Sequence, residues 1–348
     1  MTEITTATLE TELTRFFAAA RLRASDYGPH YVALWDALEG SSTGGKRVRP
    51  ALVLAAYAGF DGRNSAVVTP VAMSFELLHT AFTIHDDVID RDLARRGVPN
   101  IAGQFAQRAV AHGVGEGQAQ VWATTAAILA GDLALSEAHR SLAILPAPAP
   151  VRARLLDLLD RSVFVSAAGE LSDVTNTASD GPLAVEDVLS TLEQKTAVYS
   201  FEAPLQAGAI LAGAPEDSVD ILGRFGRLVG VAFQLADDIL GVFGDEALTG
   251  KSALADLREG KQTALVAHAG TTTAWKSIAP FIGKADLSEE EAERVRVDLR
   301  ACGALQAAQT LAGDHAREAV ALLDTPAIPA GLRLTLADLA DSAVNRCR

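Results

Sequence analysis

The stretch SFELLHTAFTIHDDVID, residues 74–90, joins an apolar helical pattern to a cluster of three aspartates. In a helix, Asp86 and Asp90 are four residues apart and share a face, whereas Asp87 points about 100° away from Asp86. Carboxylates beside apolar surface are costly to bury unless a cation pairs with them. The stretch therefore predicts a helix that brings carboxylates to a bound cation. The alternative for this motif alone is a solvated helix end with Arg91 as the ion-pair partner.

The three- and four-residue spacing of apolar residues recurs along the whole chain, which predicts helices. The ranges with this pattern are 10–37, 50–58, 66–93, 119–143, 151–174, 186–212, 217–243, 288–323 and 331–346. Strand-like alternation is scarce. The segment LPAPAP at 145–150 is a candidate linker, but it is short and helical pattern continues on both sides. We therefore expect an all-α protein with long helices, built as a single domain over residues 1–348.

Composition excludes several classes of protein. Hydrophobic residues make up 49% of the 348 residues and the net charge is −14, so the chain has material for a large core but no global basic field for nucleic acid. The two cysteines are too few for a disulfide framework. The N-terminus is acidic and polar, unlike a signal peptide, and no run of about 18 uncharged apolar residues predicts a membrane span. We expect a cytoplasmic protein without a membrane span or a nucleic-acid partner.

A second pair of aspartates, Asp237 and Asp238, lies in another apolar helical run, VGVAFQLADDILGVFGD at 229–245. Two aspartate pairs embedded in apolar helices can face each other across a cavity only if cations neutralise them. Carboxylates without His or Cys ligands indicate a hard ion, and Mg²⁺ is the natural choice. Because Mg²⁺ fills its shell with water and substrate phosphate, the carboxylates predict a phosphorylated substrate.

Local clusters of basic residues in this acidic chain are candidate sites for that phosphate. They occur in TGGKRVRP, in LARRG, in EQKTAV and in TGKSALADLREGKQT, and they comprise Lys46, Arg47, Arg49, Arg95, Arg96, Lys195, Lys251, Arg258 and Lys261. In the first of these clusters two glycines permit a tight turn and close backbone approach. The alternative for each residue is a solvated cation near a helix end.

Taken together, these motifs resemble those of the trans-isoprenyl diphosphate synthases, or polyprenyl synthetases, which include farnesyl and geranylgeranyl diphosphate synthases. The matching landmarks are GGKRVRP (44–50), LLHTAFTIHDDVIDRDLARRG (77–97), GD (131–132), GELSDV (169–174), KTA (195–197), FQLADDILGVFGD (233–245) and GKSALADLREGKQT (250–263). The resemblance implies an isoprenoid synthase fold, with long helices around a deep central cavity. It also implies a homodimer and a Mg²⁺-dependent prenyltransferase that joins isopentenyl diphosphate to C5, C10 or C15 allylic diphosphates.

The resemblance also implies roles for individual residues. Asp86, Asp90 and Asp237 are the expected Mg²⁺ ligands, with Asp238 in support. The allylic diphosphate is expected to bind Arg95, Lys195 and Lys251. Isopentenyl diphosphate is expected to bind Gly45, Lys46, Arg49, His79 and Arg96. The reacting end is expected to be lined by Thr196, Phe233 and Gln234, with Lys261 closing over it. His85 has no such role, and we expect it to form local hydrogen bonds.

Three features depart from the family pattern. The second aspartate motif reads DDILG, so Gly241 stands where a third carboxylate is expected, and Asp245 is a candidate to contribute through water. Glu170 in GELSDV replaces a glutamine. The roles of Glu170, of Asp245 and of the C-terminal Arg348 do not follow from the sequence.

Product length is expected to depend on residues that precede the first motif, namely Leu78, Ala81 and Phe82. A small residue at position 81 leaves room past Phe82, so we expect mainly a C20 (geranylgeranyl) product. The alternatives are a farnesyl or longer polyprenyl product. A class I terpene cyclase is disfavoured because it needs no isopentenyl diphosphate site. A non-catalytic subunit of a heteromeric synthase is disfavoured because both aspartate pairs are present.

Overall fold

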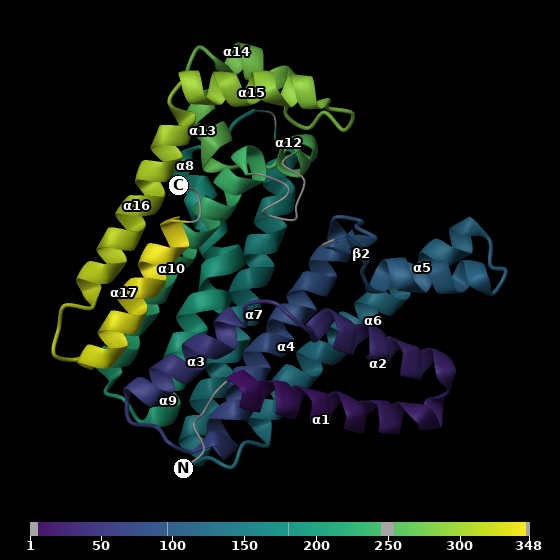
Figure 1. The fold of residues 1–348 in the computed structure, drawn as a ribbon, viewed down its shortest axis with the longest axis vertical. Coiled ribbons are helices and arrows are strands. Elements are labelled where there is room, and N and C mark those ends of the chain that lie inside the picture. The colour runs from purple at the N-terminus through teal and green to yellow at the C-terminus, as the bar shows by residue number, and fades with distance from the viewer. Residues whose placement is uncertain (1–5, 96, 180, 245–253, 346–348) are drawn as a thin grey trace. The chain divides into compact units, whose positions relative to one another are not determined.

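A computed structural model describes residues 6–95, 97–179, 181–244 and 254–345 of the chain (Figure 1). The described residues are helical apart from connecting turns and one two-stranded hairpin, which confirms the all-α prediction. Contacts divide the chain into two compact units, Met1–Asp157 with Ala207–Gly213 (unit 1) and Leu158–Gln206 with Ala214–Arg348 (unit 2). The expected single domain over residues 1–348 stays a prediction.

Unit 1 is built around helix α4. Its elements are α1 (Thr6–Ala24), α2 (Pro29–Ser42), α3 (Val48–Gly59), α4 (Ser65–Ile89), β1 (Ala94–Arg95), β2 (Val98–Pro99), α5 (Ile101–Ala111) and α6 (Glu116–Ala143). Helix α4 packs against α6, α3 and α1 (Figure 1). Asn64 caps its first turn, because its side chain accepts a hydrogen bond from the backbone N–H of Ala66. The first aspartate motif is thereby placed at the far end of a buried helix.

Helix α4 is long and apolar enough to cross a membrane by length and composition. However, 67% of the most apolar 18-residue stretch of this helix is buried inside the protein. Its fully buried side chains include Phe75, Leu77, Leu78 and Ala81. These side chains form the core of unit 1, so α4 packs as a core helix.

Unit 2 is built around helix α10. Its elements are α8 (Val185–Leu192), a π-helical segment (Glu193–Glu202), α10 (Glu216–Phe243), α12 (Ala255–Glu259), α13 (Ala264–Gly270), α14 (Trp275–Ile278), α15 (Glu289–Ala301), α16 (Ala304–Leu322) and α17 (Ala330–Val344). Helices α7 (Ala149–Thr177) and α9 (Ala203–Ala212) belong partly to each unit. Helix α10 packs against α16 and the π-helical segment, so it forms the core on which the second aspartate motif is carried.

Several predicted helix ranges were wrong at their ends or in their continuity. The range 10–37 is broken by a 3₁₀ turn at Ser25–Tyr27, and the range 288–323 is broken at Gly303, where φ is 84°. The range 66–93 ends at Ile89, because Arg91 adopts a left-handed conformation with φ of 60°. The range 186–212 contains the π-helical segment, whose i→i+5 hydrogen bonds leave no periodic signal in the sequence.

Candidate active site

The first aspartate motif is held by Arg95, which reaches back from β1 to the end of α4. The Arg95 guanidinium donates from Nε and Nη2 to Oδ1 of Asp87, at 2.9 Å and 2.6 Å. It also lies 3.6 Å from Oδ2 of Asp86. The sequence alternative named Arg91 as the ion-pair partner, but in the structure Arg95 pairs with Asp87 and lies near Asp86. Asp86 is half-buried and Asp90 is exposed. The backbone N–H of Asp90 donates to the Asp86 carbonyl at 2.9 Å, so the helical i→i+4 hydrogen bond is retained at the end of α4.

The three aspartates of this motif are therefore not equivalent. Asp87 is only 5% exposed. Burial raises the pKa of Asp87, and the hydrogen bonds from Arg95 only partly offset this effect. Asp87 thus orients Arg95, whereas Asp86 is half-buried and Asp90 is exposed, and the Mg²⁺ role expected of these two residues stays a prediction.

His85 is packed against the α6 residues Gly131 and Asp132. Its Nε2 lies 3.5 Å from Oδ1 of Asp132. A Cβ atom at position 131 would lie 2.2 Å from the same nitrogen. This local contact fits the expectation that His85 has a local role. His79, one and a half turns earlier on α4, lies with its Nδ1 3.4 Å from the Thr83 hydroxyl.

The glycine-rich loop before α3 is fixed to α4 by Arg47. The Arg47 side chain donates to Glu76 on α4 at 2.6 Å, to Glu10 on α1 at 2.6 Å and to the Ser42 carbonyl at 2.7 Å. Arg47 is 7% exposed, so this cation of the cluster is a structural residue. Gly45 has φ of 80° and open space at its Cα. The neighbouring Lys46 is exposed and Arg49 is half-buried, which leaves both beside the start of α3, where a helix dipole favours an anion.

In unit 2, Lys195 lies in the π-helical segment and contacts two carboxylates of α7. Its Nζ is 2.7 Å from Oδ2 of Asp173 and 3.0 Å from Oε2 of Glu170. Glu170, which departs from the family pattern, thus forms an ion pair with a predicted catalytic lysine. Glu170 and Asp173 are three residues apart, so on a helix they share a face and can contact the same cation. This spacing was visible in the sequence, but the ion pairs with Lys195 were not predicted from it.

The second aspartate motif is organised around the buried Asp238. Its Oδ1 accepts hydrogen bonds from Nζ of Lys261 at 2.9 Å and from Nε2 of Gln234 at 3.1 Å. Asp237 and Phe233 lie on the same helix and are half-buried. The centroid of the Phe233 ring is 5.3 Å from that of the Phe201 ring. Burial lowers the pKa of Lys261, but the carboxylates around it, Asp238 first, raise it well above its usual range. Lys261 is therefore a fixed ammonium.

These residues fit a Mg²⁺ ion that also binds phosphate. Asp238 is only 2% exposed, and its Oδ2 has no hydrogen-bond partner within the described part of the chain. A buried carboxylate oxygen without a donor is costly, and a cation supplies the missing partner. No group of three or more His, Cys, Asp or Glu residues suited to a metal occurs among the described residues. Mg²⁺ in phosphate sites usually takes one or two protein carboxylates per ion.

Glu202, at the end of the π-helical segment, is a buried acid that the sequence analysis missed. It is 1% exposed and lies 3.1 Å from both Arg161 on α7 and Arg227 on α10. Burial is the largest influence and raises the pKa of Glu202, against the two guanidinium groups. The two ion pairs tie the segment that carries Lys195 and Thr196 to both neighbouring helices.

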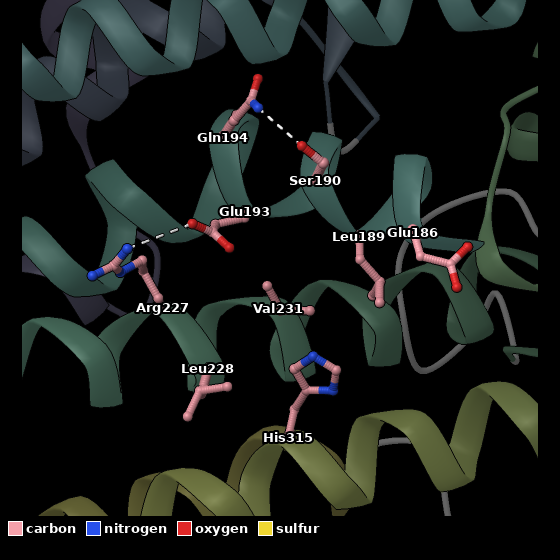
Figure 2. A pocket seen from close by; sticks show the side chains of 9 residues that line it. All are labelled: Glu186, Leu189, Ser190, Glu193, Gln194, Arg227, Leu228, Val231 and His315. Carbon is pink, nitrogen blue, oxygen red and sulfur yellow. Dashed lines mark hydrogen bonds and ion pairs between the residues drawn. The ribbon is translucent and has the colours of Figure 1, made fainter. Parts of the chain in front are cut away.

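A cavity of 390 Å³ lies beside the same segment in unit 2 (Figure 2). Its lining comprises Glu186, Leu189, Ser190, Glu193, Gln194, Arg227, Leu228, Val231 and His315. Figure 2 shows Arg227 paired with Glu193, at 3.7 Å, and Gln194 bonded to Ser190. None of the predicted site residues that the structure describes lines this cavity, but Arg227, which also pairs with Glu202, does.

Four residues of the sequence analysis fall outside the described residues. They are Arg96, Asp245, Lys251 and Arg348. Their expected roles stay predictions.

Comparisons with known proteins identify the family of this chain. The family described as polyprenyl synthetase matches residues 34–299. A geranylgeranyl diphosphate synthase of Methanosarcina mazei is 34% identical, covering 81% of this chain and 80% of that protein. A (2E,6E)-farnesyl diphosphate synthase of Mycobacterium bovis is 33% identical over 87% of this chain and 80% of its own length. An octaprenyl diphosphate synthase of Escherichia coli is 34% identical over 88% of each chain.

Among solved structures, the fold is similar to a geranylgeranyl pyrophosphate synthase from Corynebacterium glutamicum complexed with isoprenyl diphosphate and magnesium. The TM-score is 0.89 with 32% identity, covering 98% of both chains. The family match spans well over half of the chain, and the relatives span most of it. The helical fold, both aspartate motifs and these matches together confirm the resemblance, and the chain is a prenyltransferase that belongs to the polyprenyl synthetase family.

Proposed function

We propose that this protein condenses isopentenyl diphosphate with an allylic diphosphate, in a Mg²⁺-dependent head-to-tail reaction, and releases mainly the C20 product. The observation that carries the proposal is the pairing of acidic and basic groups in each unit. Arg95 is held at the first aspartate motif, and Lys261 is held at the second. This combination of carboxylates and fixed cations suits a diphosphate bound together with Mg²⁺.

The acidic residues are proposed to bind Mg²⁺, and the basic residues are proposed to bind the diphosphate. When bound, Mg²⁺ supplies positive charge that stabilises the diphosphate as it leaves. Asp86 and Asp90 are proposed to hold one Mg²⁺ ion, and Asp237 is proposed to hold a further Mg²⁺ ion, with Asp238 in support. Arg95, Lys195 and Lys251 orient the allylic diphosphate, and Lys261 neutralises the charge that develops on it. The relative crystallised with isoprenyl diphosphate and magnesium supports this ligand set.

Isopentenyl diphosphate is proposed to bind the exposed loop of unit 1 at Gly45, Lys46 and Arg49, together with His79 and Arg96. Because Arg47 fixes this loop to α4, the loop is preorganised before the substrate arrives. The double bond of this substrate attacks the allylic carbon as its bond to diphosphate breaks. The diphosphate that is released takes up the proton lost in the last step. Thr196, Phe233 and Gln234 line the reacting end.

Chain length is proposed to depend on helix α4. Leu78 and Ala81 are 0% exposed, and Phe82 is half-buried beside them. The relatives make products from farnesyl to octaprenyl. The small side chain of Ala81 is the feature that favours C20 over C15, because a bulky group there would block the tail.

We also propose a cytoplasmic homodimer. Exposed apolar side chains lie on α5 and α6, namely Val110, Val121, Ile128 and Leu129. Exposed apolar side chains on two helices that pack against each other favour contact with a second copy. The burial of α4 as a core helix supports a cytoplasmic location.

The proposal is tested by incubating the purified protein with isopentenyl diphosphate, Mg²⁺ and each of the C5, C10 and C15 allylic diphosphates. The products are then dephosphorylated and sized. A C20 alcohol is the expected result. A C15 alcohol alone would keep the reaction and change the product. Consumption of an allylic diphosphate without incorporation of isopentenyl diphosphate would contradict the proposal and indicate a cyclase.

A further inference from the structure

The second aspartate motif lacks a third carboxylate at Gly241, whereas the first motif has Asp90 at the matching position. Position 241 is four residues after Asp237 on α10, so the two positions share a face of the helix. A carboxylate there would act on the same ligand as Asp237. This face of α10 therefore has one carboxylate fewer than the family pattern.

Another carboxylate fills the space. A Cβ atom built on Gly241 would lie 2.0 Å from Oδ2 of Asp256 and 2.8 Å from its Cγ. The Asp256 carboxylate is therefore packed directly against the Cα of Gly241, and any larger residue at 241 would displace it. The Asp256 carboxylate can occupy this position only because residue 241 has no side chain.

The position of Asp256 is set by the core of unit 2. Asp256 lies on α12, whose Leu257 belongs to the same hydrophobic cluster as Ile239 and Val242 of α10. The backbone N–H of Lys261 donates to the Asp256 carbonyl at 3.0 Å. The Lys261 ammonium, which contacts Asp238, is also acted on electrostatically by Asp256. The carboxylate thus joins the charged cluster around the second motif.

We infer that Asp256 replaces the missing third carboxylate of the second motif and acts with Asp237 on the same Mg²⁺ ion. This inference rests on the proposed function. Its competitor is a purely structural role, in which Asp256 only pairs with Lys261 and holds α12 in place. The orphaned Oδ2 of the buried Asp238 indicates that this cluster needs a cation in addition to Lys261.

The test counts bound metal and does not depend on turnover. Mn²⁺ serves as a probe that electron paramagnetic resonance detects, and it is titrated into the protein with excess inorganic diphosphate. The variants are Asp256→Asn, which keeps the shape, Asp256→Ala, and Gly241→Ala, which leaves Asp256 in the chain but pushes its carboxylate away. The double variant Gly241→Asp with Asp256→Ala moves the carboxylate back onto α10. The control is Asp220→Asn, an exposed residue near the start of the same helix.

The three single variants should bind Mn²⁺ about 10- to 100-fold more weakly at one site, the range typical for loss of a group that supports a metal. The double variant should regain most of that affinity, and the Asp220→Asn control should match the natural protein. Thermal unfolding without metal checks that each variant is folded.

Unchanged Mn²⁺ binding in Asp256→Asn and Asp256→Ala, while the natural protein binds normally, would overturn this inference and leave the proposed function intact. Loss of binding without recovery in the double variant would assign Asp256 the structural role and overturn it too. A natural protein that binds no Mn²⁺ with diphosphate would overturn the proposed function itself.

Discussion

Gly169 on α7 lies so close to the π-helical segment that a Cβ atom at this position would be 2.3 Å from the backbone nitrogen of Lys195. Real Cβ atoms do not approach backbone this closely, so the glycine permits the packing. The same contact region holds the ion pairs of Lys195 with Glu170 and Asp173. The backbone at Lys195 is thus positioned by direct contact with α7.

Gly169→Ala should push the π-helical segment away from α7. Overpacking of this kind costs about 1–3 kcal/mol of unfolding free energy, measured by urea denaturation. Because Lys195 and Thr196 move with the segment, KM for the allylic diphosphate should rise. The control is Gly313→Ala on α16, where a Cβ meets nothing within 4 Å. That variant should be neutral or slightly stabilising, and an equal effect of both would contradict the argument.

Lys46 and Arg47 are neighbours in the sequence with opposite expected phenotypes. Arg47→Ala leaves Glu76, which is 7% exposed, without its cation, and should lower the unfolding free energy by about 3–5 kcal/mol. Lys46→Ala removes an exposed cation and should change stability by less than about 0.5 kcal/mol. It should instead raise KM for isopentenyl diphosphate. Urea denaturation and steady-state kinetics on both variants check this division, and a stability loss in Lys46→Ala would contradict it.

Asp86→Ala should abolish most activity, because Asp86 is the proposed Mg²⁺ ligand that Arg95 approaches at 3.6 Å. A loss of about 4 kcal/mol of barrier stabilisation corresponds to roughly a 1000-fold fall in turnover. The matched control is Asp36→Ala on α2, where the aspartate side chain is 54% exposed. Turnover is measured with saturating Mg²⁺ and both substrates. Near-normal turnover in Asp86→Ala would remove this residue from the mechanism.

Ala81→Phe should shorten the product. Position 81 is 0% exposed on α4, so a ring there takes space that we assign to the growing tail. Ala81→Val is a smaller step and should shift the product distribution less. Products are sized after dephosphorylation, with a single allylic starter. A distribution that stays the same in a folded Ala81→Phe protein would show that chain length is set elsewhere.

Helices could be predicted from the sequence because their apolar residues are periodic. Contacts between residues on different elements could not be predicted in this way. Helices α4 and α10 were predicted because apolar residues recur with helical spacing over more than six turns. The change of partner from Arg91 to Arg95 was missed because it depends on a left-handed residue and a two-residue hairpin. Neither of these has a periodic signal.

The contact of Asp256 with Gly241 was missed for a related reason. The two residues lie 15 positions apart in sequence (256 − 241), on different helices. Their contact follows from the packing of Leu257 into the core of unit 2. The glycine at 241 was visible in the sequence as a missing carboxylate, but the group that fills its place was not.

Glu202 gives the stability of this protein a specific dependence on pH. Its pKa in the folded protein is raised above the ordinary value of 4.5, chiefly by burial. The folded state therefore holds the proton more tightly than the unfolded state. The contribution of Glu202 to stability is fully present below that ordinary value and is lost as pH rises through the higher folded value. The slope is at most about 1.4 kcal/mol per pH unit for one proton.

Glu202→Gln should remove this dependence while keeping a polar group between Arg161 and Arg227. The unfolding free energy of the natural protein, minus that of Glu202→Gln, should fall with rising pH just above 4.5 and then level off. Asp87 has a raised pKa as well, but it is present in both proteins and cancels. Urea denaturation from pH 4 to pH 7 measures the difference, with Glu186→Gln, an exposed acid of α8, as the control. A difference that rises with pH would mean that the two guanidinium groups outweigh burial, and that Glu202 stabilises the π-helical segment in its charged form.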